Sequence, residues 1–167
     1  DAVLSVDGSA AESEPFDVAI IVIGERPYAE GLGDVRAAGS VAPGSSVERP
    51  DLQLRPYGST LELAVTHPED LETIRRVAAR GIPVITVLIS GRPLVVNSEL
   101  EESAAFVAAW LPGSEGGGVA DVLFGAYDFQ GRLSFSWPRN DRDNWNRGDE
   151  NYAPLFPYGY GLTLNQH

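Results

Sequence analysis

The chain has 167 residues, of which 43% are hydrophobic and 22% are charged, a composition typical of one globular domain. It contains no cysteine, and only His67 and His167 offer imidazole, so a disulfide framework is excluded and no metal site is expected. The net charge is −12 and every positive residue is arginine, so neither a nucleic acid nor an anionic membrane surface is an expected partner. No apolar run approaches the roughly 18 residues of a membrane span.

Four apolar runs predict strands. The second and third are almost continuously apolar and rich in β-branched residues, which is typical of parallel strands buried on both faces. The fourth run is rich in alanine, but its length and the Pro-Gly that follows favour a strand over a helix. The four predicted strands are residues 2–6, 17–23, 83–89 and 104–111.

Between the second and third strands the sequence predicts an amphipathic helix. Thr66 and Glu69 have the spacing of a capping box, with a proline in the first turn. The apolar positions then follow helical spacing as far as Arg80, and Gly81 is suited to end the helix. We therefore expect a helix from Thr66 to Arg80.

The order of these elements predicts the fold class. Shorter helices are expected over residues 98–103 and 116–124, so that strands alternate with helices. This alternation predicts an α/β domain with an open, mainly parallel sheet and helices on both faces. Residues 133–137 alternate in polarity before Pro138, which predicts one antiparallel edge strand.

Candidate functional residues follow the predicted strands, because ligands of open α/β sheets gather at the carboxyl ends of the strands. Three such loops are expected, at residues 24–30, 90–93 and 112–118. The first loop carries Glu25 and Glu30 with Tyr28 between them, and opens a long segment rich in glycine and proline. A carboxyl group at a cleft edge beside an aromatic ring can act as a proton donor near neutral pH. The alternative is a solvated acidic loop, which is common in so acidic a chain.

Five segments in order resemble glycoside hydrolase family 3, in its β-glucosidase and exo-β-glucanase branch. They are IGERPYAE (23–30), VLISGRPL (87–94), AWLPGSEG (109–116), LFGAYDFQGRLSFSWP (123–138) and LFPYGYGL (155–162). The resemblance extends over the whole chain. It implies that residues 1–167 are most of the C-terminal α/β sandwich domain, without the N-terminal barrel that carries the aspartate nucleophile. Because the chain starts at Asp1 and has no methionine, we also expect it to be a processed product or a cut piece of a longer chain.

The resemblance also assigns roles to residues. Glu30 matches the general acid/base of the family, and Tyr28 is expected to contact substrate. Glu25 is the alternative acid/base, although its place nearer the strand favours a structural role. The implied reaction is retaining hydrolysis of β-glucosidic bonds in β-glucosides or β-glucan oligosaccharides, which needs two carboxyl groups and no cofactor.

The partner implied is the barrel domain of the same enzyme, and the implied location is secreted or periplasmic. The isolated chain is expected to be inactive because it lacks the nucleophile. The rival hypothesis is a non-catalytic module that contacts carbohydrate or serves a structural role.

Overall fold

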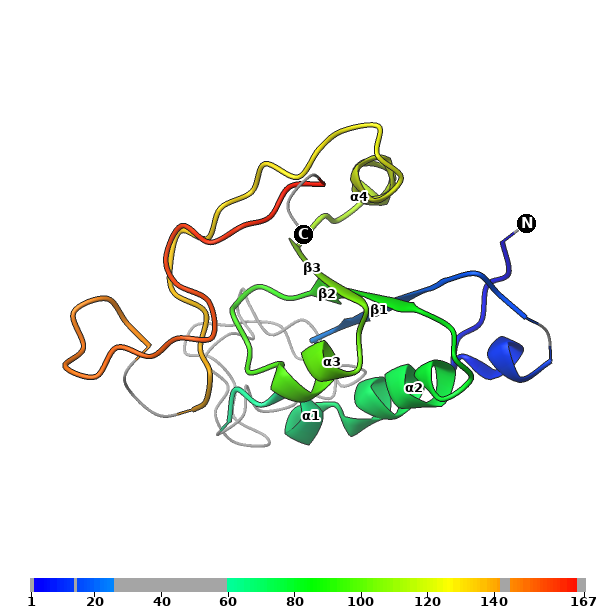
Figure 1. Cartoon of the computed structure of the whole chain (residues 1–167), viewed down its shortest axis with the longest axis horizontal. Helices are drawn as coiled ribbons and strands as arrows, with labels where there is room; N and C mark the ends of the chain where they lie inside the picture. Colours follow the sequence, from blue (N-terminus) through cyan, green and yellow to red (C-terminus); the bar gives the residue numbers. More distant parts are fainter. Residues whose placement is uncertain (1, 14, 26–59, 142–144, 165–167) are drawn as a thin grey trace, which may run out of the picture.

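A computed structural model describes residues 2–13, 15–25, 60–141 and 145–164 of the chain. Its sheet has three parallel strands in the order β1-β2-β3 (Figure 1). The strands are β1 (Ala19–Gly24), β2 (Val84–Ile89) and β3 (Ala105–Trp110). The helices are η1 (Ser9–Glu12), α1 (Leu63–Thr66), α2 (Pro68–Ala78), α3 (Asn97–Glu101) and α4 (Gly116–Leu123). The predicted α/β fold with a parallel sheet is confirmed.

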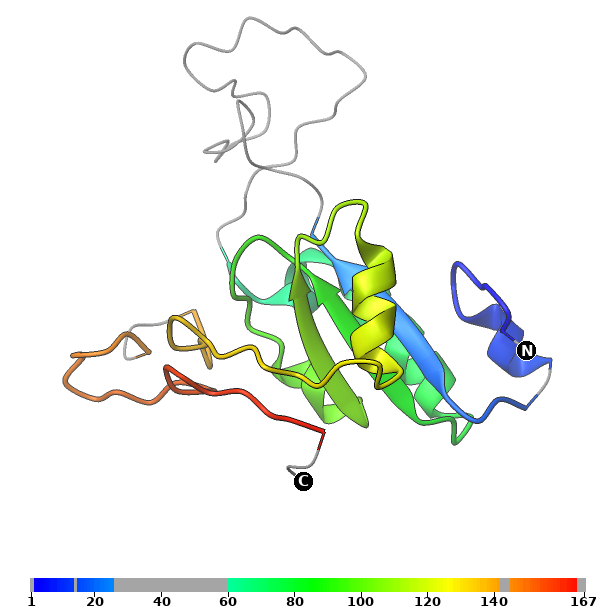
Figure 2. The same cartoon turned by 90° about the horizontal axis from the view of Figure 1, so that it is seen from above.

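Helices lie on both faces of this sheet. The first three, α1 to α3, lie below it in the view of Figure 1, and α4 lies above it. The turned view in Figure 2 shows α4 crossing in front of the strands, with α2 behind them. This is the layered arrangement that alternating strands and helices produce.

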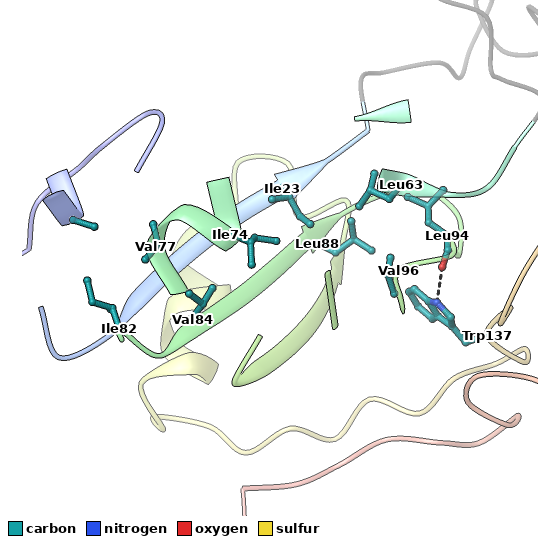
Figure 3. Close-up of a cluster of buried hydrophobic side chains, with 11 residues drawn as sticks. Ile23, Leu63, Ile74, Val77, Ile82, Val84, Leu88, Leu94, Val96 and Trp137 are labelled. Carbon is teal, nitrogen blue, oxygen red and sulfur yellow. Dashed lines mark hydrogen bonds between the residues drawn. The ribbon is translucent and has the colours of Figure 1, made fainter. Parts of the chain in front are cut away.

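The core lies between the sheet and α2. Ile74 of α2 is fully buried, and Val84 and Leu88 of β2 are each 1% exposed. Ile23 of β1 completes this layer, and Figure 3 shows the four side chains side by side. The spacing of Leu71, Ile74 and Val77 gives α2 the continuous apolar face that such packing requires.

Trp137 closes the far end of the same core. It is 3% exposed, and its indole Nε1–H donates a 2.7 Å hydrogen bond to the Leu94 carbonyl oxygen (Figure 3). The hydrogen bond to the Leu94 carbonyl oxygen compensates for the burial of the indole N–H. This contact attaches the C-terminal part of the chain to the segment that follows β2.

The opposite face of the sheet is less covered. On β1, Ile20 is 40% exposed and Val22 is 64% exposed, although Val87 of β2 is buried. No residue of α4 is buried. An open pocket of about 300 Å³ lies between β3 and α4, lined mainly by apolar side chains such as Val107, Val122 and Phe129.

Two predicted strands were wrong. Residues 2–5 have no regular structure and residues 6–8 form a bend, because this short apolar run pairs with no strand in the described ranges. The predicted edge strand at 133–137 does not join the sheet either. It makes an isolated antiparallel bridge, Trp137 to Phe156, and Leu133 exchanges hydrogen bonds with the C-terminal segment.

The start of the main helix also differs from the prediction. Thr66 belongs to α1, and α2 begins at Pro68 after His67, which makes no side-chain capping bond. The Thr66 hydroxyl is directed to the carbonyl oxygens of Glu62 and Leu63 and so is not available as a cap. At the other end Gly81 has φ +76°, as a glycine that ends a helix often does. None of the helices in the described part of the chain is both long and apolar enough to cross a membrane.

A substitution at Gly24, the last residue of β1, tests how closely β1 and β2 approach each other there. A Cβ added to Gly24 would lie 2.2 Å from the Ile89 carbonyl oxygen, so neither strand could keep its position. We expect Gly24→Ala to lower the free energy of unfolding by about 1–3 kcal/mol, the usual cost of overpacking. Denaturant unfolding measures this change.

Gly117→Ala is the matched control, because nothing lies within 4 Å of a Cβ at that position in α4. This substitution should leave the stability unchanged or raise it by up to about 1 kcal/mol, since alanine favours a helix. Equal effects of the two substitutions would contradict the close contact at Gly24.

Candidate functional site at the carboxyl ends of the strands

The carboxyl ends of β1 and β2 lie side by side. In the parallel register Gly24 is opposite Ile89, and the Glu25 N–H donates a 3.1 Å hydrogen bond to the Ile89 carbonyl oxygen. Glu25 and Ser90 are therefore the first residues beyond the sheet on neighbouring strands. Two of the three predicted loops thus begin at the same place.

A buried ion pair joins these two loops. The Arg92 guanidinium donates to Glu25 Oε1 from Nη2 at 2.6 Å and from Nε at 3.0 Å. The side chains are only 13% and 7% exposed, respectively. Two N–H bonds fix the planar guanidinium against the carboxylate, which a lysine could not do.

Ser90 completes this cluster from within the turn. Its Oγ lies 3.0 Å from Glu25 Oε2 and 2.6 Å from the Arg92 carbonyl oxygen, so its single proton serves either acceptor. The same Oγ accepts the Arg92 N–H at 3.2 Å. Ser90 is 2% exposed, so its hydroxyl is satisfied by these groups and not by bulk water.

The three residues form a clamp on the end of β1, which we call the Glu25 clamp (Glu25, Ser90 and Arg92). Both carboxyl oxygens of Glu25 are occupied by this clamp. The occupied oxygens fit the structural role that the sequence favoured for Glu25. The clamp fixes the position and direction of the chain where it leaves the sheet.

Asp70 ties helix α2 to the same strand end. Its Oδ2 accepts the Gly24 N–H at 3.4 Å, a contact between residues 46 positions apart. Burial raises the pKa of Asp70, while the hydrogen bond from Gly24 and the nearby His67 act in the opposite direction. No sequence signal indicates this contact, because Asp70 has the pattern of an ordinary acidic residue in a first helical turn.

The end of β3 carries an aromatic cluster. Trp110 has φ +57°, and the register with β2 shifts at Leu88 and Ile89. The Trp110 ring packs edge-on against Phe135, with centroids 5.5 Å apart, and lies 5.8 Å from Trp137. A tryptophan at positive φ is strained, so the packing of its ring is what maintains this backbone. The sequence did not single out this cluster.

The residues that the sequence favoured for chemistry, Glu30 and Tyr28, lie outside the described residues. The strand that leads to them ends at the Glu25 clamp. The third predicted loop, 112–118, follows β3 and leads into α4. The described ranges contain no group of three or more His, Asp or Glu side chains that could hold a metal ion.

The contribution of the Glu25 clamp to stability can be tested by substitution. Glu25→Gln keeps the shape of the side chain but removes the charge that neutralises the buried Arg92. Removing one partner of a buried ion pair typically costs about 3–5 kcal/mol, and we expect a loss of about 3 kcal/mol because the amide oxygen still accepts a hydrogen bond. The free energy of unfolding is the quantity to measure.

Glu102→Gln provides the matched control. Glu102 pairs with Arg75 at 2.9 Å, but the two side chains are 37% and 56% exposed. Removing such a solvent-exposed pair should cost less than about 1 kcal/mol. A loss for Glu25→Gln no larger than for Glu102→Gln would show that the clamp does not stabilise the fold.

Comparison with known proteins identifies the family. The chain matches the Glycosyl hydrolase family 3 C-terminal domain over residues 5–164. It is 32% identical over 145 residues to the xylan 1,4-β-xylosidase of Xylanibacter ruminicola, an alignment that covers 80% of this chain and 17% of that enzyme. It is 35% identical over 115 residues to the periplasmic β-glucosidase of Salmonella typhimurium, covering 55% of this chain and 15% of that enzyme.

Solved structures agree with this match. The exo-1,3/1,4-β-glucanase of a Pseudoalteromonas species is 48% identical and superposes with a TM-score of 0.68, over 88% of this chain and 16% of that one. The chain therefore spans less than a fifth of each of these relatives. The resemblance read from the sequence is confirmed, and because the match extends over nearly all residues, the chain belongs to the glycosyl hydrolase family 3 C-terminal domains.

Proposed function

We propose that this domain supplies the general acid/base, Glu30, of a retaining exo-acting β-glucosidase or β-glucanase. The observation that carries the proposal is the 48% identity to an exo-1,3/1,4-β-glucanase over 88% of the chain. The segment 23–30, which resembles the family's acid/base motif, begins with the last two residues of β1. A second carboxyl group is required, and we propose that the barrel domain of the same enzyme provides it as the nucleophile.

The chemistry proceeds in two steps. Glu30 protonates the leaving glycosidic oxygen while the nucleophile attacks the sugar, and then removes a proton from the water that releases the glycosyl-enzyme. In retaining enzymes the two carboxyl groups lie about 5–5.5 Å apart. Because the nucleophile comes from another domain, docking of the barrel sets this separation. The reaction needs no metal or organic cofactor.

The described residues support this role through the end of β1. Glu30 follows Glu25 by five residues, and Glu25 is held by Arg92 and Ser90. The Glu25 clamp thus gives the acid/base segment a fixed point of departure from the sheet. A fixed start matters because general acid catalysis requires the donor to lie within hydrogen-bond reach of the leaving oxygen. Tyr28 is proposed to contact the substrate from the same segment.

The names of the relatives support proposals for the substrate and the location. We propose β-glucosides or β-glucan oligosaccharides as substrates, as the name of the Pseudoalteromonas enzyme indicates for that protein. The relatives include a periplasmic β-glucosidase of Salmonella typhimurium and a lysosomal β-glucosidase of Dictyostelium discoideum. A secreted or periplasmic location is accordingly proposed for this protein.

The first test concerns the isolated chain. One acid/base carboxyl group cannot carry out a double displacement, so the 167-residue chain should not hydrolyse an aryl β-glucoside. Joining it to the family's N-terminal barrel domain should create turnover that the barrel alone does not show. Robust turnover by the chain alone would overturn the proposed division of roles between the domains.

The second test concerns Glu30 in the barrel-joined enzyme. Glu30→Gln should lower hydrolysis of glucosides with poor leaving groups by about 10²–10⁴-fold, the usual contribution of general acid catalysis. The glycosylation step of an activated aryl glucoside should suffer far less, because its leaving group departs without protonation. Added azide should restore the second step by attacking the glycosyl-enzyme without a general base.

Glu48→Gln is the matched control, since it makes the same change within the segment that follows β1. It should leave both substrates unaffected. If Glu30→Gln also leaves both unaffected, Glu30 is not the acid/base. Loss of turnover in Glu25→Gln would then assign the role to Glu25, and unchanged turnover in that variant would favour the structural or carbohydrate-contacting role.

A further inference from the structure

A glutamate outside the proposed catalytic machinery is completely buried. Glu99 in α3 has an exposed fraction of 0%, whereas its helix neighbour Glu101 is exposed. Neither of its carboxyl oxygens has a hydrogen-bond partner in the described part of the chain. Buried carboxylates are almost always paired, so this side chain needs an explanation.

The backbone of Glu99 is anchored to the sheet. Ser103 Oγ donates a 2.6 Å hydrogen bond to the Glu99 carbonyl oxygen. Ser103 Oγ also lies 2.6 Å from Thr86 Oγ1, and Thr86 of β2 is itself fully buried. These contacts hold the end of α3 against β2 and so fix the backbone of Glu99 at the junction of helix and sheet.

Few charges surround this carboxyl group. In the described residues the groups that act on it are Asp70 and Arg75, both on α2. Arg75 is exposed and directs Nε to Glu102 at 2.9 Å, and Asp70 is itself subject to His67 and Glu69. The strands β2 and β3 contain no charged residue. Within the described ranges, therefore, no cation pairs directly with the Glu99 carboxyl group.

The electrostatic balance favours the neutral acid. Burial raises the pKa of Glu99 and the negative charge of Asp70 adds to the rise, while the residue's own backbone N–H and Arg75 act in the opposite direction. Removing an unpaired carboxylate from water costs far more than removing a neutral acid. The burial of Glu99 and the net effect of the surrounding charges thus both disfavour its ionised form.

We propose that Glu99 is a proton-binding site that keeps α2 and α3 packed against the sheet, and that its ionisation loosens this packing. Asp70 connects the site to the strand that carries the Glu25 clamp, because it accepts the Gly24 N–H at 3.4 Å. The proposal stands apart from the proposed function, since it concerns only the stability of this chain.

The direction of the pH effect follows from linkage. The folded chain keeps the Glu99 proton to higher pH than the unfolded chain does. The stabilisation is fully present below the ordinary glutamate pKa and is lost as the pH rises through the raised pKa. Between these two values the ratio of folded to unfolded chain falls by about tenfold per pH unit on account of this one group.

The test is denaturant unfolding of the 167-residue chain at a series of pH values from about 4 to about 9, which spans the ordinary glutamate pKa. Glu99→Gln retains the shape of the neutral acid and cannot ionise. In this variant the ratio of folded to unfolded chain should lack the tenfold fall per pH unit that Glu99 causes in the wild type. The variant should therefore be more stable than the wild type at high pH. Glu101→Gln is the matched control, because it makes the same change on the exposed side of α3 and should keep the wild-type pH profile.

A second measurement keeps the proposal decidable if Glu99→Gln fails to fold. The side-chain carboxyl resonances of ¹³C-labelled glutamate, followed in the wild type, should contain one that titrates at higher pH than an ordinary glutamate. In Asp70→Asn this resonance should titrate at lower pH, because a neighbouring negative charge is gone. Identical pH profiles for wild type and Glu99→Gln, or the absence of a late-titrating glutamate, would overturn the proposal.

Discussion

The close parallel contact of β1 and β2 determines the rest of this structure. The strands pair from Ala19 and Val84 to Gly24 and Ile89, where the backbones approach so closely that only glycine fits. This register places Glu25 and Ser90 next to each other at the sheet edge. The ion pair with Arg92 can then be buried, because the carboxylate and the guanidinium meet in a fixed geometry with two hydrogen bonds.

Among the described residues, the carboxyl groups of Glu25, Asp70 and Glu99 are buried or partly buried beside this sheet, and each is stabilised differently. Glu25 has a guanidinium and a hydroxyl as partners, and Asp70 has one backbone N–H. Glu99 has no partner among the described residues, and burial raises its pKa as it raises that of Asp70. The fewer compensating partners a carboxyl group has, the more its neutral form is favoured. Glu25 therefore suits a permanent structural contact, and Glu99 suits a response to pH.

The two faces of the sheet contribute unequally to stability. The α2 face buries Ile23, Ile74, Val84 and Leu88 in one continuous layer that Trp137 closes. The α4 face leaves Ile20 and Val22 partly exposed, and its helix has no buried residue. The first face therefore supplies most of the hydrophobic stabilisation. The Glu25 clamp, the Asp70 contact and Glu99 all depend on elements that this face holds in place.

The sequence alone determined the three paired strands, since long runs of β-branched or apolar residues bounded by Gly and Pro have few other solutions. It also determined the family, because the motifs around Arg92, Trp110 and Leu123 stand in a specific order. It failed for residues 2–6 and 133–137, because a short apolar run forms a strand only where a partner strand is available. Local patterns cannot show whether such a partner exists.

The tertiary structure alone decided which polar groups meet. Glu25 and Arg92 are 67 positions apart, and Gly24 and Asp70 are 46 apart, so neither contact has a local signature. Glu99 shares its short helix with Glu101, yet Glu99 is buried and Glu101 is exposed, in a helix whose end the Ser103 and Thr86 contacts hold against β2. Local sequence sets the propensity of each segment, but the pairing, burial and protonation of its charged groups depend on what the fold brings beside them.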